Sequence, residues 1–219
     1  MKNKIKIKVY NKKINGGKIK MKINKTIMIV ISLIVLITQT VFAHPGFSEE
    51  NNKTISLTAN EEQLKIINNL ENFEDLTPLE VIKIVFPEEY GKINFKGKKL
   101  LNKKFDYEKA VNQDRLIHCG SEINIYGNDI VYESYNNYDT TESYVESSLK
   151  NNLGDRVAYT LNYGTDITYL EAKGAANPDT GTYRTYGRHS WMAIDEYGND
   201  IEVYNVSSTT YISYVNPYN

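Results

Sequence analysis

The second half of the chain, residues 117–219, is a series of short β-type runs separated by turn residues. Val157, Tyr159 and Leu161 alternate with other residues, and Ile201 alternates with Val203, as in strands with one buried face. This half holds 15 of the 18 tyrosines, 14 acids and only five bases. We therefore predict a mainly β fold whose core is an antiparallel β-sandwich over residues 117–219.

One short sequence occurs twice in this half. Tyr126-Gly127-Asn128-Asp129-Ile130 recurs as Tyr197-Gly198-Asn199-Asp200-Ile201, each time between two β-type runs. Glycine beside asparagine or aspartate is typical of tight hairpin connections. The repeat therefore predicts two β-hairpin turns.

Two helices are predicted before the β-type runs. The segment Thr58–Glu61 has the pattern of a capping box, and apolar residues then recur from Leu64 to Phe73 at near-helical spacing. In the second helix Thr77 is the N-cap, Pro78 suits the first helical position and Glu80 can reach back to the cap.

These signals divide the chain after its leader into three segments. We expect a flexible N-terminus at 44–58, a helical arm at 59–116 that includes a basic linker at 96–104, and the sandwich at 117–219. Because an isolated helix of this length is marginal in water, the arm is expected to dock on the sandwich.

The first 43 residues have the order of a secretory signal peptide. The apolar run Ile27–Ile37 follows Lys22 and Lys25 and precedes Ala43, a small residue suited to cleavage. The run is shorter than the roughly 18 to 20 residues needed to span a bilayer. We expect export, cleavage after Ala43 and a secreted chain without a transmembrane segment.

The leader is unusually long, since residues 1–20 carry eight lysines and no acid. Met21 would begin a signal peptide of ordinary length. The Gly16-Gly17 pair can be encoded by a purine run of the ribosome-binding type. Translation is therefore expected to start at Met21 if those two codons have that composition.

The charge of the mature chain limits its partners. Ten of the 26 bases and none of the 27 acids lie in residues 1–43, which leaves 16 bases, 27 acids and a formal charge of −11. Nucleic acids and anionic membranes are bound through basic surfaces. The expected partner is instead an extracellular protein or an envelope glycan.

A five-residue segment bears on the architecture. Asp179-Thr180-Gly181-Thr182-Tyr183 has the spacing of the tyrosine corner, in which the tyrosine hydroxyl bonds upstream backbone. It resembles the corner of immunoglobulin-like sandwiches, which implies such a sandwich with Asp179 and Tyr183 in structural roles. The pattern of Gly181, Thr182, Tyr183, Gly187 and His189 also resembles small secreted β-sandwich proteins of Gram-positive bacteria, for which no common activity follows.

Three residues are candidates for thiol chemistry. His189-Ser190-Trp191 precedes Asn205, and Cys119 is the single cysteine. The segment from Gly187 to Asn205 resembles papain-like and transglutaminase-like enzymes, which implies Cys119 as nucleophile, His189 as base and Asn205 as orienting residue.

The structural interpretation of the same residues uses strand parity. If Tyr183 points into the core, His189 and Trp191 do so too, and His189 is then a hydrogen-bonded core histidine. Cys119 precedes an alternating run rather than opening a helix, where a dipole would favour the thiolate. We favour this interpretation.

A metal site is the remaining chemical candidate. Cleavage after Ala43 would expose His44 as an N-terminal histidine, a feature that resembles copper-dependent polysaccharide oxygenases and implies His118 or His189 as a second ligand. His44 leads into a polar segment rather than a core strand, so we expect neither a metal nor a cofactor.

The function predicted from these observations is that of a secreted, non-enzymatic binding protein. The tyrosines between Tyr126 and Tyr144 alternate with polar residues, a composition that suits aromatic surfaces for sugar rings or partner proteins, or cross-strand pairs on an exposed sheet. A bacteriocin-like role belongs to the same class. The alternative is a thiol hydrolase or acyl transferase using Cys119, His189 and Asn205.

Overall fold

The computed structural model describes residues 54–112 and 118–218. The leader expected at 1–43, the cleavage after Ala43 and the residue His44 lie outside this part of the chain. Two antiparallel β-sheets and several short helices make up the described residues. The fold is therefore mainly β, as the sequence predicts.

The larger sheet has six strands. Its order is β1-β5-β4-β7-β8, and β9 pairs with the first residues of β7. The bounds are β1 (Ile55–Thr58), β4 (Thr140–Asn151), β5 (Arg156–Ile167), β7 (Gly181–Ile194), β8 (Asp200–Ser208) and β9 (Ile212–Tyr214).

The smaller sheet has three strands in the order β2-β3-β6. Their bounds are β2 (Cys119–Tyr126), β3 (Asp129–Asn136) and β6 (Leu170–Ala176). Both repeats found in the sequence form hairpins, one between β2 and β3 and the other between β7 and β8. Gly127 and Gly198 have φ angles of 60° and 82°, a region in which glycine is favoured, so the turn prediction is confirmed.

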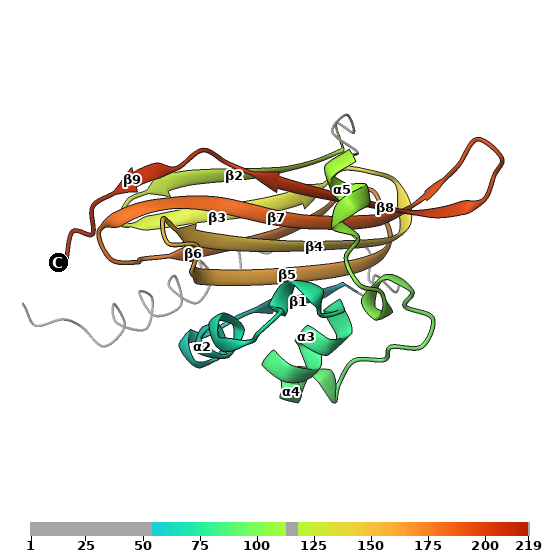
Figure 1. The fold of residues 1–219 in the computed structure, drawn as a ribbon, viewed down its shortest axis with the longest axis horizontal. Helices are drawn as coiled ribbons and strands as arrows, with labels where there is room; N and C mark the ends of the chain where they lie inside the picture. The colour runs from blue at the N-terminus through green and yellow to red at the C-terminus, as the bar shows by residue number, and fades with distance from the viewer. Residues whose placement is uncertain (1–53, 113–117, 219) are drawn as a thin grey trace, which may run out of the picture. The chain divides into compact units, whose positions relative to one another are not determined.

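The smaller sheet packs against one face of the larger sheet, as Figure 1 shows. Alternate residues of β7 point into this interface, with Tyr183 at its apolar end and His189 further along. The apolar end contains Ile130 and Tyr132 from β3 and Leu149 from β4. The rest of the interface is rich in hydroxyl and amide groups.

Helices cover the other face of the larger sheet. They are α2 (Glu61–Asn69), η1 (Phe73–Asp75), α3 (Pro78–Val85), α4 (Pro87–Tyr90), η2 (Leu100–Asn102) and α5 (Tyr107–Asn112). Figure 1 shows α2 and α3 beside β1 and β5, and α4 beside α3. Ile67, Phe73 and Val81 from these helices share one core with Tyr159 and Leu161 of β5. The helices and the sheet therefore bury their apolar faces together.

Two local features differ from the sequence prediction. Residues 55–58, expected within the flexible N-terminus, pair with β5 because Ile55 and Leu57 continue its sheet. The first capping box is formed by Asn60 and Gln63 rather than by Thr58 and Glu61. The second is formed by Thr77 and Glu80, as predicted.

The segment 96–104, expected as a basic linker, contributes to the core. Leu100 and Leu101 are buried, and the backbone N–H of Leu100 donates to Glu142 Oε2 at 3.0 Å. Lysines on both sides of this pair made the segment look like a solvated linker. Two adjacent leucines in a short 3₁₀ turn are enough to anchor it.

The strand pairing differs in chain order from that of an immunoglobulin domain. Constant-type immunoglobulin domains have sheet neighbours A-B-E-D and C-F-G. Here the corresponding neighbours are β8-β7-β4-β5 and β6-β3-β2.

The hydrogen bond expected at the tyrosine corner is present, because the Tyr183 hydroxyl donates to the Asp179 carbonyl at 2.7 Å. However, Tyr183 lies on β7, in the larger sheet, whereas a tyrosine corner belongs to strand F of the smaller one.

Candidate functional site

The three thiol-enzyme candidates lie near one another between β2, β7 and β8. Asn205 is the register partner of His189, and its Nδ2 donates to Cys119 Sγ at 3.1 Å. Cys119 pairs in turn with Asn136 on β3. The structure thus brings Cys119 and Asn205 into direct contact, with His189 on the neighbouring strand.

Both ring nitrogens of His189 are bonded to other side chains. Nδ1 lies 2.9 Å from Asn136 Oδ1, and because an amide oxygen only accepts, Nδ1 carries the proton. Nε2 therefore accepts from the Ser207 hydroxyl at 2.6 Å. His189 thus faces Ser207 rather than Cys119.

Burial disfavours the charged forms of the thiol and the imidazole. His189 is fully buried, and this burial lowers its pKa to about 3. Burial raises the pKa of Cys119 to about 11, although the hydrogen bond from Asn205 acts in the opposite direction. A thiol enzyme needs a thiolate beside a base that can hold a proton, and neither charged form is favoured here.

The set Ser207, His189 and Asn136 has the connectivity of a serine hydrolase triad, and sequence reasoning did not identify it. A triad histidine must become positively charged in the transition state. No carboxylate bonds His189, and its low pKa opposes that charge. Ser207, His189 and Asn136 therefore lack the stabilisation of a charged imidazole that a catalytic triad needs.

The hydroxyls around Ser207 instead connect the two sheets. Ser207 lies 2.5 Å from Ser121, Ser121 lies 2.8 Å from Ser134, and Ser134 donates to Ser147 at 3.0 Å. We call this chain, with His189 and Asn136, the polar seam. A Cβ atom on Gly187 would lie 2.5 Å from Ser134 Oγ and 2.7 Å from His189 Nε2. The seam is thus closely packed around Gly187.

Trp191, expected as a structural residue, is also buried. It lies on the same face of β7 as His189, opposite Ser143 of β4. Its ring centroid is 6.0 Å from that of Tyr138. The buried interface between the sheets therefore continues past His189 to Trp191.

The tyrosines from 126 to 144 divide between the core and the surface. Tyr132 and Tyr144 are buried, whereas Tyr126 is 65% exposed. Tyr135 lies on the outer face of the smaller sheet and stacks on Tyr169, with ring centroids 6.1 Å apart and an interplanar angle of 25°. The Tyr135 ring covers Gly120, since a Cβ atom there would lie 2.7 Å from its hydroxyl oxygen.

The residues around this stacked pair are mostly acidic. On the outer face the row next to Gly120 and Tyr135 consists of Glu122, Glu133 and Lys173. Lys173 Nζ lies 2.6 Å from Glu133 Oε2, and Tyr169 donates to Glu171 Oε2 at 3.1 Å. We call this outer surface of β2, β3 and β6, with Tyr169, the tyrosine face.

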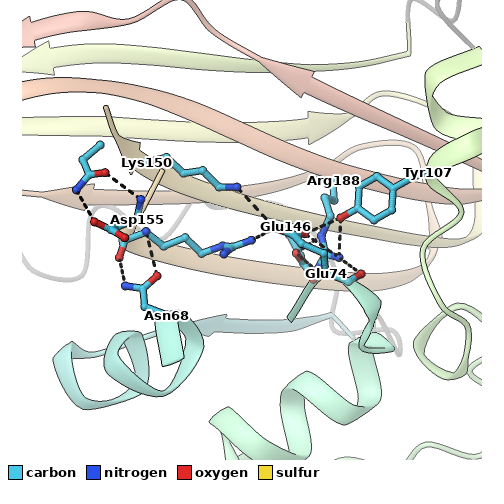
Figure 2. A network of polar contacts seen from close by, with 9 residues as sticks. Asn68, Glu74, Tyr107, Glu146, Lys150, Asp155 and Arg188 are labelled. Carbon is cyan, nitrogen blue, oxygen red and sulfur yellow. Dashed lines mark hydrogen bonds and ion pairs between the residues drawn. The ribbon is translucent and has the colours of Figure 1, made fainter. Parts of the chain in front are cut away.

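Charged residues gather on the helix-covered face of the larger sheet. Arg188 makes two bonds of 2.6 Å to the carboxylate of Glu146, and both side chains are buried. Figure 2 shows Glu74 between Lys150 on one side and Arg188 and Tyr107 on the other. Glu74 lies 3.6 Å from Lys150 and 3.4 Å from Arg188, and it also pairs with Arg156.

These contacts shift the ionisation of two groups. Burial alone would raise the pKa of Glu74, but Arg188 and Arg156 lower it to about 2. Burial, reinforced by Arg156, lowers the pKa of Lys150 to about 8. Glu74 therefore stays ionised over the physiological range, whereas Lys150 is close to its titration point.

No family model matches the chain. No curated protein matches it either, and no solved structure does. Within residues 54–112 and 118–218, no three histidine, cysteine or acidic side chains come together in a way that could hold a metal ion. No helix in the same residues is long and apolar enough to cross a membrane.

Proposed function

We propose that the chain is a secreted, non-enzymatic protein that binds a neutral or amino-sugar glycan of the cell envelope through the tyrosine face. Secretion is expected from the leader at 1–43 with cleavage after Ala43. The immunoglobulin-like likeness concerns architecture alone and supports no particular ligand. The proposal rests mainly on the stacked pair Tyr135 and Tyr169.

The stacked pair offers an aromatic surface of the kind that sugar rings bind. Tyrosine presents a large apolar ring together with a polar hydroxyl, which suits ligands that are apolar on one face and wet at the edge. Tyr169 is 48% exposed. The pair is thus accessible to a ligand from solvent.

The length of the tyrosine face favours an oligosaccharide. Tyr126 lies opposite Asp129 at the far end of the same face, six positions along β3 from Tyr135. Six strand residues span about 20 Å. An extended chain of sugars could contact Tyr126 and Tyr169 together, whereas a single sugar could not.

The charge of the face limits the class of glycan. Glu122, Glu133 and Glu171 outnumber Lys173, so a strongly anionic polymer would be repelled. Carboxylates accept hydrogen bonds from sugar hydroxyls and from ammonium groups. A neutral or amino-sugar polymer therefore fits the tyrosine face best.

The thiol-enzyme alternative has less support. The pKa of its nucleophile Cys119 is about 11 and that of its base His189 is about 3. Its orienting residue Asn205 donates to Cys119, whereas His189 is bonded by Asn136 and Ser207. An extracellular protein partner or a bacteriocin-like role would use the same exposed face. The glycan is preferred because the aromatic pair lies among carboxylates rather than in an apolar patch.

The test is a binding assay with N-acetylglucosamine oligomers and with insoluble peptidoglycan. Tyr169→Ala is expected to weaken binding about tenfold, the effect of losing one aromatic anchor. Tyr197→Ala is the matched control, because Tyr197 is 80% exposed in the loop between β7 and β8, away from the tyrosine face. Equal affinities for both variants, or no binding by the unaltered protein, would refute the proposal.

A further inference from the structure

Four of the five bases in residues 117–219 lie on one face of the larger sheet. Arg156 on β5 is the register partner of Lys150 on β4, and Lys150 is also the partner of Arg184 on β7. Arg188 lies on the same face of β7, four residues along. We call Lys150, Arg156, Arg184 and Arg188 the cation cluster. Residues 117–219 hold 14 acids and only five bases, so bases spread evenly through this half would lie mainly beside acids and not beside one another.

The carboxylates in contact with the cluster balance only half of its charge. Glu146 pairs with Arg188, and Glu74 is shared by Lys150, Arg156 and Arg188. Arg184 has no carboxylate within 4.0 Å in the part of the chain that the structure describes. The cluster thus carries four positive charges against two negative ones.

Two buried donors of the cluster are also unpaired. The Nε atoms of Arg156 and Arg184 are buried and have no hydrogen-bond partner among the described residues. Buried donors in folded proteins are almost always bonded to protein, water or a ligand. Like charges on neighbouring strands also repel one another. Both features favour the binding of an anion beside Arg184.

The Arg184 end of the cluster is half-buried and lies beside aromatic rings. The Arg184 guanidinium lies 5.1 Å from the ring centroid of Tyr211, which is 47% exposed. Lys150 Nζ lies 4.1 Å from the ring centroid of Tyr186. Glu74 already shows how the cluster holds an oxygen anion, since three of its bases surround that carboxylate.

We propose that Arg184 and Lys150, at the half-buried end of the cation cluster, form a binding site for a phosphate group. A phosphate dianion matches the two unbalanced positive charges and accepts hydrogen bonds from several guanidinium and ammonium donors at once. This site lies on the opposite face of the larger sheet from the tyrosine face. It is therefore independent of the proposed glycan function.

The experiment is calorimetric titration of the purified chain with sodium phosphate at pH 7, with sodium chloride of equal ionic strength as reference. Arg184→Gln is expected to weaken phosphate binding at least about tenfold, because a charged hydrogen-bond donor is lost. Lys173→Gln is the matched control, because Lys173 is the fifth base of the same half and lies on the tyrosine face. It should bind phosphate as the unaltered chain does.

Two sources of phosphate are distinguished by repeating the titration with glycerol 2-phosphate. Tighter binding of the ester indicates a phosphorylated larger molecule, and tighter binding of inorganic phosphate indicates the free ion. If Arg184→Gln does not fold, Arg184→Lys replaces it and should retain part of the affinity. No binding above the chloride reference, or equal binding by Arg184→Gln, would overturn the proposal.

Discussion

Lowering the pH from 7 to 4.5 is expected to destabilise the fold through His189. The imidazole is buried and neutral between the sheets, with Nδ1 donating to Asn136 and Nε2 accepting from Ser207. Protonation would place a charge in the polar seam and turn Nε2 into a second donor. The unfolded chain accepts the same proton without such a cost.

The magnitude follows from the two pKa values of His189. Its pKa is about 3 in the fold and about 6.5 in the unfolded chain. Because the folded value is the lower one, the contribution of His189 is fully present above about pH 6.5 and is lost as the pH falls toward about 3. At pH 4.5 the loss amounts to about 2.7 kcal/mol, or about 1.4 kcal/mol for each pH unit below 6.5.

The assay is urea unfolding at half-unit intervals between pH 7 and 4.5, with His189→Gln as the comparison. Glutamine does not titrate, so the variant should show a much flatter dependence, whatever its absolute stability. The chain has three histidines, and NMR of their ring protons should show one that does not titrate above pH 4.5. Equal slopes for the two proteins would refute the reasoning.

Three further predictions concern single side chains. Cys119 should react slowly with iodoacetamide at pH 7 in the folded state, because its pKa is raised to about 11 by burial; rapid reaction would indicate a functional thiol. Tyr183→Phe should cost about 1 kcal/mol in urea unfolding through loss of the bond to Asp179, whereas Tyr126→Phe should have no effect. Glu146→Gln should cost about 3–5 kcal/mol because the buried Arg188 loses the carboxylate that it bonds twice and keeps only Glu74, at 3.4 Å, and an unchanged unfolding midpoint would contradict this.

The parts of the fold predicted from the sequence are those determined by neighbouring residues. The helix at Thr77 follows from its cap, its proline and Glu80, which all lie within one turn. The hairpins at Gly127 and Gly198 follow from local turn chemistry. The inward direction of His189 follows from its parity with Tyr183 on one strand. Each of these signals requires no knowledge of which strands pair.

The parts that the sequence did not predict depend on pairing between distant strands. Arg156 and Arg184 are 28 residues apart in the sequence and meet only because β5 and β7 both flank β4. Ser207 meets His189 because β8 folds back on β7 with one particular register. No periodicity within one strand contains this information. The cation cluster and the polar seam can therefore be recognised only when the pairing of the strands is known.

The hydrogen bonds of the polar seam give His189, a candidate catalytic residue, a structural role. An apolar interface between two sheets tolerates sliding by two residues, because alternate side chains then still face inward. The bonds from His189 to Asn136 and Ser207 join three strands and allow only one alignment of the sheets. Sliding would leave buried donors unpaired, which is costly. The seam thus fixes the register between the sheets, and this leaves the tyrosine face and the half-buried Arg184 end of the cation cluster as the surfaces on which ligands can be bound.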